Sequence, residues 1–134
     1  MNNEVIKMGN DLPLNGGSAV RPEHPRPDLR GRIWLNLNGL WNFKFDDYDQ
    51  GEKEGWSTGE GEFDRKIMVP FPFQSRLSGI HDESFHNTVW YQRNFSTPES
   101  FSGKRIFLHF GAVDYEAKVW LNRNFLGSHR GGYT

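Results

Sequence analysis

The chain has 134 residues, 16 Lys+Arg against 17 Asp+Glu, and a formal net charge of -1. This length corresponds to one domain. The near-balanced charge gives no field able to capture a polyanion, so the composition argues against nucleic acid as the main partner. The sequence contains no apolar run that could span a membrane, no signal-peptide pattern and no cysteine. These features favour a cytoplasmic protein without disulfides or thiolate metal sites.

Residues 1–30 are polar and predict an extended arm ahead of the folded domain. Three prolines lie within residues 21–27, and proline can neither donate to a sheet ladder nor continue a helix. The sequence favours a flexible tail, and the alternative is a strap lying across a partner domain. The folded domain is expected to span residues 31–134.

The clearest strand pattern covers residues 40–46. Trp41, Phe43 and Phe45 fall on one side of this run, and polar side chains fall on the other. Such a period of two is typical of a half-buried strand. Residues 113–121 alternate in the same way and place Trp120 on the polar side, where solvent or another domain would cover it.

Five further apolar or aromatic runs raise the expected number of strands to about seven. They cover residues 33–37, 66–71, 88–95, 104–110 and 125–128. No window shows a helical period with caps, so helix should be limited to a turn or two. Many short strands joined by Gly- and Pro-rich loops predict an all-β fold, a β-sandwich or jelly roll.

Two long loops, residues 51–63 and 74–87, are the natural places for a binding function. His81 and His86 share the second loop with acidic neighbours. Their spacing matches no strand or helix geometry that would bring ligands together, so a solvated loop is favoured over a metal site. The sequence therefore predicts no metal and no other cofactor.

Catalysis by this chain is not favoured. A glycosidase needs two carboxylates at a controlled separation, whereas the acids near the first loop are crowded together and indicate a hydrated surface. These acids are Asp46, Asp47, Asp49, Glu52 and Glu54. The sequence also lacks a Gly-x-Ser-x-Gly elbow. No catalytic residue is predicted.

Aromatic residues make up 15% of the chain and are its most informative excess. Trp56, Trp90 and Trp120 could remain partly exposed and offer a flat face to a sugar ring, although packing within the fold or against another domain is favoured for each. The candidate substrate-binding residues are Trp56, Trp120 and Asn87, which ends the second loop.

Several segments in a fixed order resemble the N-terminal domain of family 2 glycoside hydrolases. That family includes β-galactosidases, β-glucuronidases and β-mannosidases. The segments are LNGLWNF at 37–43, VP at 69–70, VWYQRNF at 89–95, LHFGAVDYEAKVWLN at 108–122 and GGYT at 131–134. The resemblance runs from about residue 33 to the end of the chain.

The resemblance implies a jelly-roll, galactose-binding-like β-sandwich, often described as sugar-binding. In the family an immunoglobulin-like domain and a TIM barrel follow it, and the barrel holds both catalytic glutamates. The family segment normally continues past GGYT, so the sandwich is expected to be incomplete at its C-terminal end, and uncovered strand edges favour self-association into a homo-oligomer.

The favoured function is therefore support of a catalytic barrel in a retaining β-glycosidase, β-galactosidase-like in the first instance. This segment alone is expected to be inactive. The alternative is a free-standing carbohydrate-binding or protein-interaction module, and an independent catalyst ranks third.

One departure from the family lies at a hairpin, where Asn122-Arg123 stands in place of the usual Asn-Gly. A two-residue turn favours positive φ at both positions, and that conformation costs an arginine about 1 kcal/mol. A three-residue loop with Asn124 in the left-handed region is the alternative.

Overall fold

The computed structural model describes residues 3–9, 20–23, 28, 33–59 and 61–132, with residues 3–9 described by their backbone. The described part is all-β, which confirms the expected fold class. Its strands are β1 (Asn3–Gly9), β2 (Gly39–Phe45), β3 (Arg65–Val69), β4 (Thr88–Asn94), β5 (Glu116–Leu121) and β6 (Asn124–Arg130). Short 3-10 turns are η2 (Trp56–Thr58), η3 (Arg76–Ser78) and η4 (Glu99–Phe101). Within these ranges no helix is long and apolar enough to cross a membrane.

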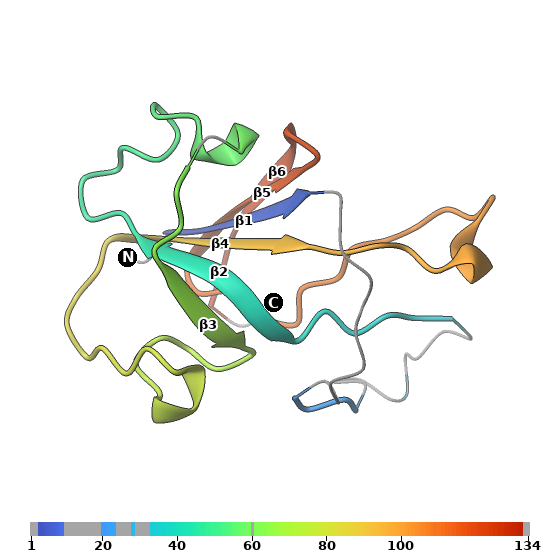
Figure 1. The fold of residues 1–134 in the computed structure, drawn as a ribbon, viewed down its shortest axis with the longest axis horizontal. Helices are drawn as coiled ribbons and strands as arrows, with labels where there is room; N and C mark the ends of the chain where they lie inside the picture. Colours follow the sequence, from blue (N-terminus) through green and yellow to red (C-terminus); the bar gives the residue numbers. More distant parts are fainter. Residues whose placement is uncertain (1–2, 10–19, 24–27, 29–32, 60, 133–134) are drawn as a thin grey trace.

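The strands form one six-stranded sheet in the order β3-β2-β4-β1-β5-β6 (Figure 1). β2 runs antiparallel to β3 and to β4, and β5 runs antiparallel to β6. β1 lies between β4 and β5 and runs parallel to both. The sheet is therefore mixed, and β1 supplies every parallel pairing in it.

The position of β1 corrects the prediction of an arm over residues 1–30. Asn3–Gly9 form a strand inside the sheet, not a tail or a strap outside it. The strand forms because β4 and β5 hydrogen-bond to its backbone on both sides, and these partners lie far away in the sequence. Most of the remaining residues of the predicted arm lie outside the described residues.

The strands predicted at 40–46, 66–71, 88–95 and 125–128 are confirmed as β2, β3, β4 and β6, with small shifts at their ends. β5 begins later than the predicted start at residue 113. The runs at 33–37 and 104–110 are not strands, so these two predictions are wrong. An apolar run becomes a strand only when a neighbour pairs with it, and neither run pairs with the sheet.

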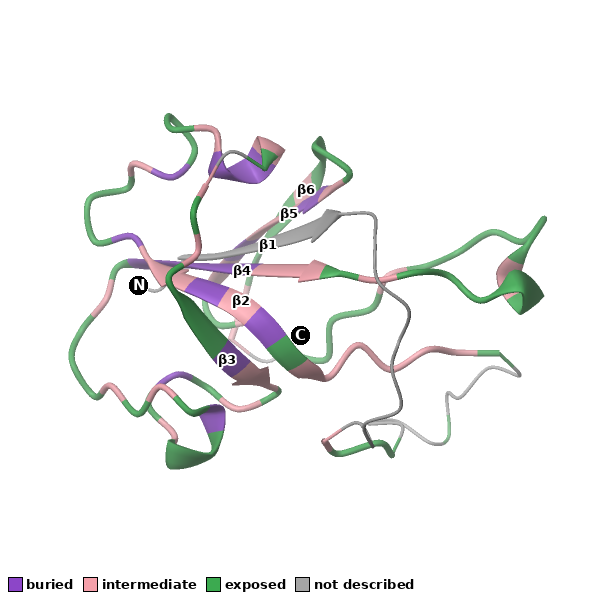
Figure 2. Ribbon diagram, in the orientation of Figure 1, coloured by how far each residue is buried: buried purple, intermediate pink, exposed green. Residues whose placement is uncertain are grey.

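Both faces of β4 are buried, which places this strand at the centre of the fold (Figure 2). Val89 and Tyr91 join one apolar cluster, and Trp90 joins another. Because successive side chains of a strand point to opposite faces, the two clusters lie on opposite sides of the sheet. The first cluster has the buried members Trp41, Phe43, Ile67, Phe73, Val89 and Tyr91, and the second has Trp56, Trp90 and Trp120.

Arg93 fixes the beginning of β2 from the neighbouring strand. Its Nη1 donates to the carbonyl oxygens of Leu37 and Asn38 at 2.7 and 2.9 Å, and burial lowers the pKa of its guanidinium. Gly39 has φ +125°, and a Cβ there would lie 3.1 Å from the Arg93 Nη1. The glycine of the LNG segment is therefore required by its conformation and by the arginine beside it.

The hairpin between β5 and β6 is a two-residue turn. Asn122 and Arg123 have φ values of 49° and 70°, and β6 begins at Asn124. Positive φ at both central residues identifies the type I′ geometry that Asn-Gly favours. The three-residue alternative is therefore wrong, and Arg123 occupies the strained position.

Replacing Arg123 with glycine is expected to raise the free energy of unfolding by about 1 kcal/mol, because glycine adopts a left-handed conformation without the Cβ penalty. Urea unfolding followed by tryptophan fluorescence measures the change. Arg123→Ala is the control, since alanine keeps a Cβ and should give no such gain. Equal stability of the two variants would contradict a strained Arg123.

Candidate functional site

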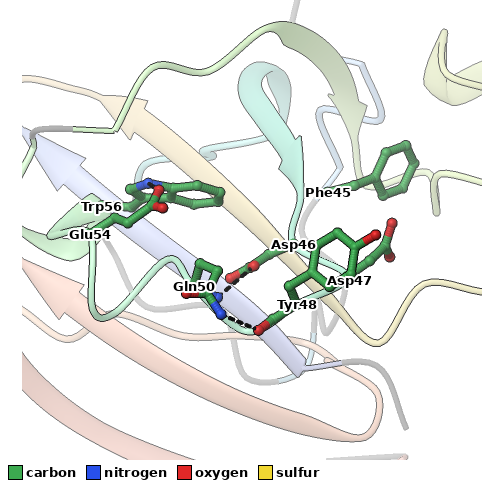
Figure 3. A pocket seen from close by; sticks show the side chains of 7 residues that line it. All are labelled: Phe45, Asp46, Asp47, Tyr48, Gln50, Glu54 and Trp56. Carbon is green, nitrogen blue, oxygen red and sulfur yellow. Dashed lines mark hydrogen bonds between the residues drawn. The ribbon is translucent and has the colours of Figure 1, made fainter.

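The loop that follows β2 lies against the residues that lead into β4. The backbone amide of Asp46 donates to the Thr88 carbonyl at 2.8 Å, and the Thr88 hydroxyl donates to the Asp49 carboxylate. An open depression of about 270 Å³ lies beside these contacts (Figure 3). Its lining residues are Phe45, Asp46, Asp47, Tyr48, Gln50, Glu54 and Trp56.

Asp46 is buried and organises the first long loop. Its carboxylate accepts hydrogen bonds from the backbone amides of Gln50 and Gly51, each at 2.8 Å, and from Trp90 Nε1 at 2.9 Å. The prediction that Asp46 belongs to a hydrated acidic surface is therefore wrong. The carboxylate satisfies three donors at once, so it acts as a structural acceptor that joins the loop to β4.

Trp56 is 6% exposed, so its ring packs within the fold, as the sequence favours, and the alternative of a partly exposed ring does not hold. Its Nε1 donates to Glu54 Oε2 at 3.0 Å. The Lys44 Nζ lies 3.9 Å from its ring centroid, and Trp90 contacts it edge-on with centroids 5.6 Å apart. The protein's own side chains therefore occupy the surface that a sugar ring would need.

Trp120 is covered by its own fold. Its ring stacks on Trp90 with centroids 5.7 Å apart and contacts Phe125 at 5.2 Å. Trp120 and Trp90 are 7% and 1% exposed. Packing within the fold, which the sequence favours over partial exposure, therefore accounts for both rings.

His86 ties the second long loop to the end of β2 and to the residues that follow it. Its imidazole lies flat on Phe45, with centroids 3.6 Å apart and an interplanar angle of 14°. Nδ1 lies 2.8 Å from Asp47 Oδ1, while Nε2 lies 3.0 Å from Ser84 Oγ and 3.5 Å from Asp82 Oδ2. The predicted solvated loop holds for His81, whose side chain is 44% exposed, but not for His86, whose side chain is 11% exposed. The contacts anchor the end of the loop to the loop after β2.

Asp82 holds the turn that precedes His86. Its Oδ1 accepts hydrogen bonds from the hydroxyl and the backbone amide of Ser84, and the bond from the hydroxyl is the main cause that holds the pKa of Asp82 below its usual range. Because the pKa of Asp82 is lower in the folded state than in the unfolded state, its ionised carboxylate stabilises the turn at pH values above the unfolded pKa of about 3.9. This stabilisation is lost as the pH falls through the folded pKa.

Ser84→Ala is therefore expected to raise the pKa of Asp82 toward its usual value. Titration of the side-chain carboxyl carbon by NMR measures the midpoint directly. Ser100→Ala, in the exposed η4 turn, serves as the matched control and should leave the midpoint unchanged. An Asp82 midpoint that does not move in Ser84→Ala would contradict the assigned hydrogen bond as the cause.

Asn87 is exposed and stands directly before β4. It lies in the same loop as His86, whereas Trp56 and Trp120 lie in the buried cluster on the sheet. The structure thus separates the predicted site residues into one exposed polar residue and two buried rings. Sequence reasoning missed the anchoring roles of Asp46 and His86. The alternation of β2, continued by one residue, already places Asp46 on the face of Lys44.

The carboxylates that line the depression are engaged by the protein itself. Asp46 binds Trp90, Asp47 binds His86, and Glu54 accepts from Trp56. Among the residues that the structure describes, no three His, Asp or Glu side chains are arranged to hold a metal ion. The arrangement is suited to holding loops in place.

Comparison with known proteins adds a family match. The family model "Glycosyl hydrolases family 2, sugar binding domain" matches residues 34–134. The chain is 32% identical over 107 residues to a β-galactosidase of Thermoanaerobacter pseudethanolicus. The alignment covers 78% of this chain and 14% of the β-galactosidase. It is 31% identical over 109 residues to a β-glucuronidase of Paenibacillus borealis. That alignment covers 81% of this chain and 18% of the β-glucuronidase.

A solved structure shows the same likeness. The β-glucuronidase of Lactobacillus rhamnosus superposes with a TM-score of 0.62 and 37% sequence identity, over 72% of this chain and 16% of that protein. The chain therefore spans less than a fifth of the length of each of these three relatives.

Proposed function

Because this chain belongs to family 2 of the glycosyl hydrolases and carries its sugar binding domain over residues 34–134, we propose that it serves as the N-terminal domain of a retaining β-glycosidase that is β-galactosidase-like. In this role the domain packs on a catalytic barrel and shapes the mouth of its active site. The barrel supplies the chemistry, and this chain supplies no catalytic carboxylate. The relatives named as β-galactosidase and β-glucuronidase support a β-glycoside as substrate.

The observation that carries the proposal is a loop that is anchored yet exposes apolar side chains. His86 fixes one end of the 74–87 loop to Asp47, while Leu77 and Phe85 are 66% and 72% exposed. Large apolar side chains on an ordered loop are typical of a surface that another domain covers. In the proposed arrangement Asn87, which is exposed at the end of the same loop, faces the sugar.

A chimeric enzyme tests the proposal. Residues 1–134, which include β1, replace the corresponding segment of the Thermoanaerobacter pseudethanolicus β-galactosidase, and hydrolysis of p-nitrophenyl β-D-galactoside is compared with that of a deletion lacking the segment. The chimera should be active and the deletion inactive. Asn87→Ala in the chimera should lower kcat/KM about tenfold, a loss equivalent to about 1.4 kcal/mol, while exposed Asn94→Ala should not. A chimera no more active than the deletion argues against the proposal.

The chain alone is expected to show no saturable change in tryptophan fluorescence on titration with galactose, glucuronate or mannose. Its Trp56, Trp90 and Trp120 rings are buried and have no free face for stacking. Denaturation of the sample in urea provides the positive control for the fluorescence signal. A saturable response to one sugar would instead support the alternative, a free-standing carbohydrate-binding module.

A further inference from the structure

β1 joins two halves of the sheet that do not otherwise pair. β3, β2 and β4 form one antiparallel half, and β5 and β6 form the other. β4 pairs with β1 along Asn3–Gly9, and β5 pairs with β1 along residues 3–8. The sheet is continuous only because one strand fills the slot between β4 and β5 (Figure 1).

The strand in this slot comes from outside the region that matches the family. The match begins at residue 34, and residues 10–38 connect β1 to β2. The entropic cost of closing a loop rises only slowly with its length, so a connection of about thirty residues keeps β1 close to the slot but does not fix it there. β1 is also parallel to both neighbours, and parallel pairing is slightly less stable per residue than antiparallel pairing.

An empty slot would present two strand edges at once. The N–H and C=O groups of β4 and β5 that now bind β1 would be unpaired, and unpaired edges are templates for a strand from another chain. The occupant that fits the existing register is the sequence that already fills it. In that register Val5 stands opposite Trp90 on β4 and Lys118 on β5.

We propose that the slot between β4 and β5 is a strand-exchange site, in which β1 of a second copy of this chain takes the place of the resident β1. Self-association then uses an internal position of the sheet, between β4 and β5, and not an outer edge. The same backbone ladder forms in the closed and the exchanged states. The balance between them is therefore set by the concentration of the chain relative to the millimolar effective concentration of the tethered strand.

Thiol trapping detects the exchange, because the chain has no cysteine of its own. Val5→Cys and Lys118→Cys variants of the 134-residue chain are mixed and treated with a short bis-maleimide. These positions are opposite one another in the β1–β5 ladder. A crosslinked dimer should form, and its yield should rise with protein concentration and exceed by about fivefold that of Val5→Cys mixed with Lys66→Cys on the distant β3. An excess of a peptide of residues 2–10 should reduce the yield.

Two further measurements make the result decisive. The double variant Val5→Cys/Lys118→Cys should crosslink within one chain, which verifies that β1 fills the slot. A second pair from the same ladder, Asn3→Cys with Glu116→Cys, guards against a variant that fails to fold. An internal crosslink without any specific dimer would overturn the exchange, because the slot would then be closed to other chains. Absence of the internal crosslink in both pairs would overturn it as well.

Discussion

Replacing Phe43 with alanine is expected to lower the free energy of unfolding by about 3–5 kcal/mol. Its side chain is fully buried on β2. The ring packs against Phe45, Tyr91 and Phe73 with centroids 4.9, 5.1 and 6.2 Å apart. Removal of the ring loses this contact area and leaves a cavity that close-packed neighbours fill only in part. Urea unfolding followed by tryptophan fluorescence measures the loss.

Leu40→Ala is the matched control, because Leu40 lies on the same strand and is 55% exposed. It should change the free energy of unfolding by no more than about 0.5 kcal/mol. Similar losses in Phe43→Ala and Leu40→Ala would mean that the centre of the apolar cluster lies elsewhere. The expected loss in Phe43→Ala is a large part of the 5–15 kcal/mol that typically stabilises a whole domain.

Asp46→Ala is expected to lower the free energy of unfolding by about 3–5 kcal/mol, because it leaves the Gln50 and Gly51 amides and the Trp90 indole N–H without their acceptor. Each unsatisfied buried donor costs about 1–3 kcal/mol. Amide hydrogen exchange at Gln50 and Gly51 should accelerate in the same variant, which locates the effect in the loop.

Asp46→Asn should give an intermediate loss, because the amide keeps the size of the side chain and one acceptor oxygen. Asp64→Ala is the control for simple loss of a negative charge, since the Asp64 side chain is 61% exposed. An Asp46→Ala variant no less stable than Asp64→Ala would contradict the role of Asp46 as a buried acceptor.

The strands that were predicted correctly from the sequence can be recognised from the pattern of neighbouring residues alone. In β2 the buried side chains of Trp41 and Phe43 alternate with half-buried Asn42 and Lys44. This alternation follows from the geometry of a single strand and does not depend on which strands lie beside it. β4 does not alternate, because both of its faces are buried, and its evidence is instead a continuous apolar and aromatic run.

β1 and the run at 104–110 show the limit of that reasoning. β1 is a strand because β4 and β5 accept it, although its own sequence lies in a polar region. The 104–110 run has the apolar composition of a strand, with Phe107 67% exposed, and pairs with nothing in the sheet. A strand forms only beside a partner strand, and which strands lie side by side is decided by the tertiary fold and not by the local sequence.

The candidate site was predictable as a pair of loops but not as a set of contacts. Loop positions follow from Gly, Pro and Ser content, which is local. The burial of Asp46 depends on the indole of Trp90, and the anchoring of His86 depends on Asp47, each across a large distance in sequence. A count of acidic residues in one loop therefore described Asp46 as hydrated when its environment is buried.

The order of strands in the sheet has a consequence for synthesis of the chain on the ribosome. β1 is made first, but both of its neighbours, β4 and β5, are made only after residue 87. At roughly 5–20 residues per second, β1 waits on the order of 4–16 s before the first of them exists. During this interval β2 and β3 can already form their hairpin, whereas β1 has no native partner. The translation rate therefore sets how long nascent β1 remains without a native partner.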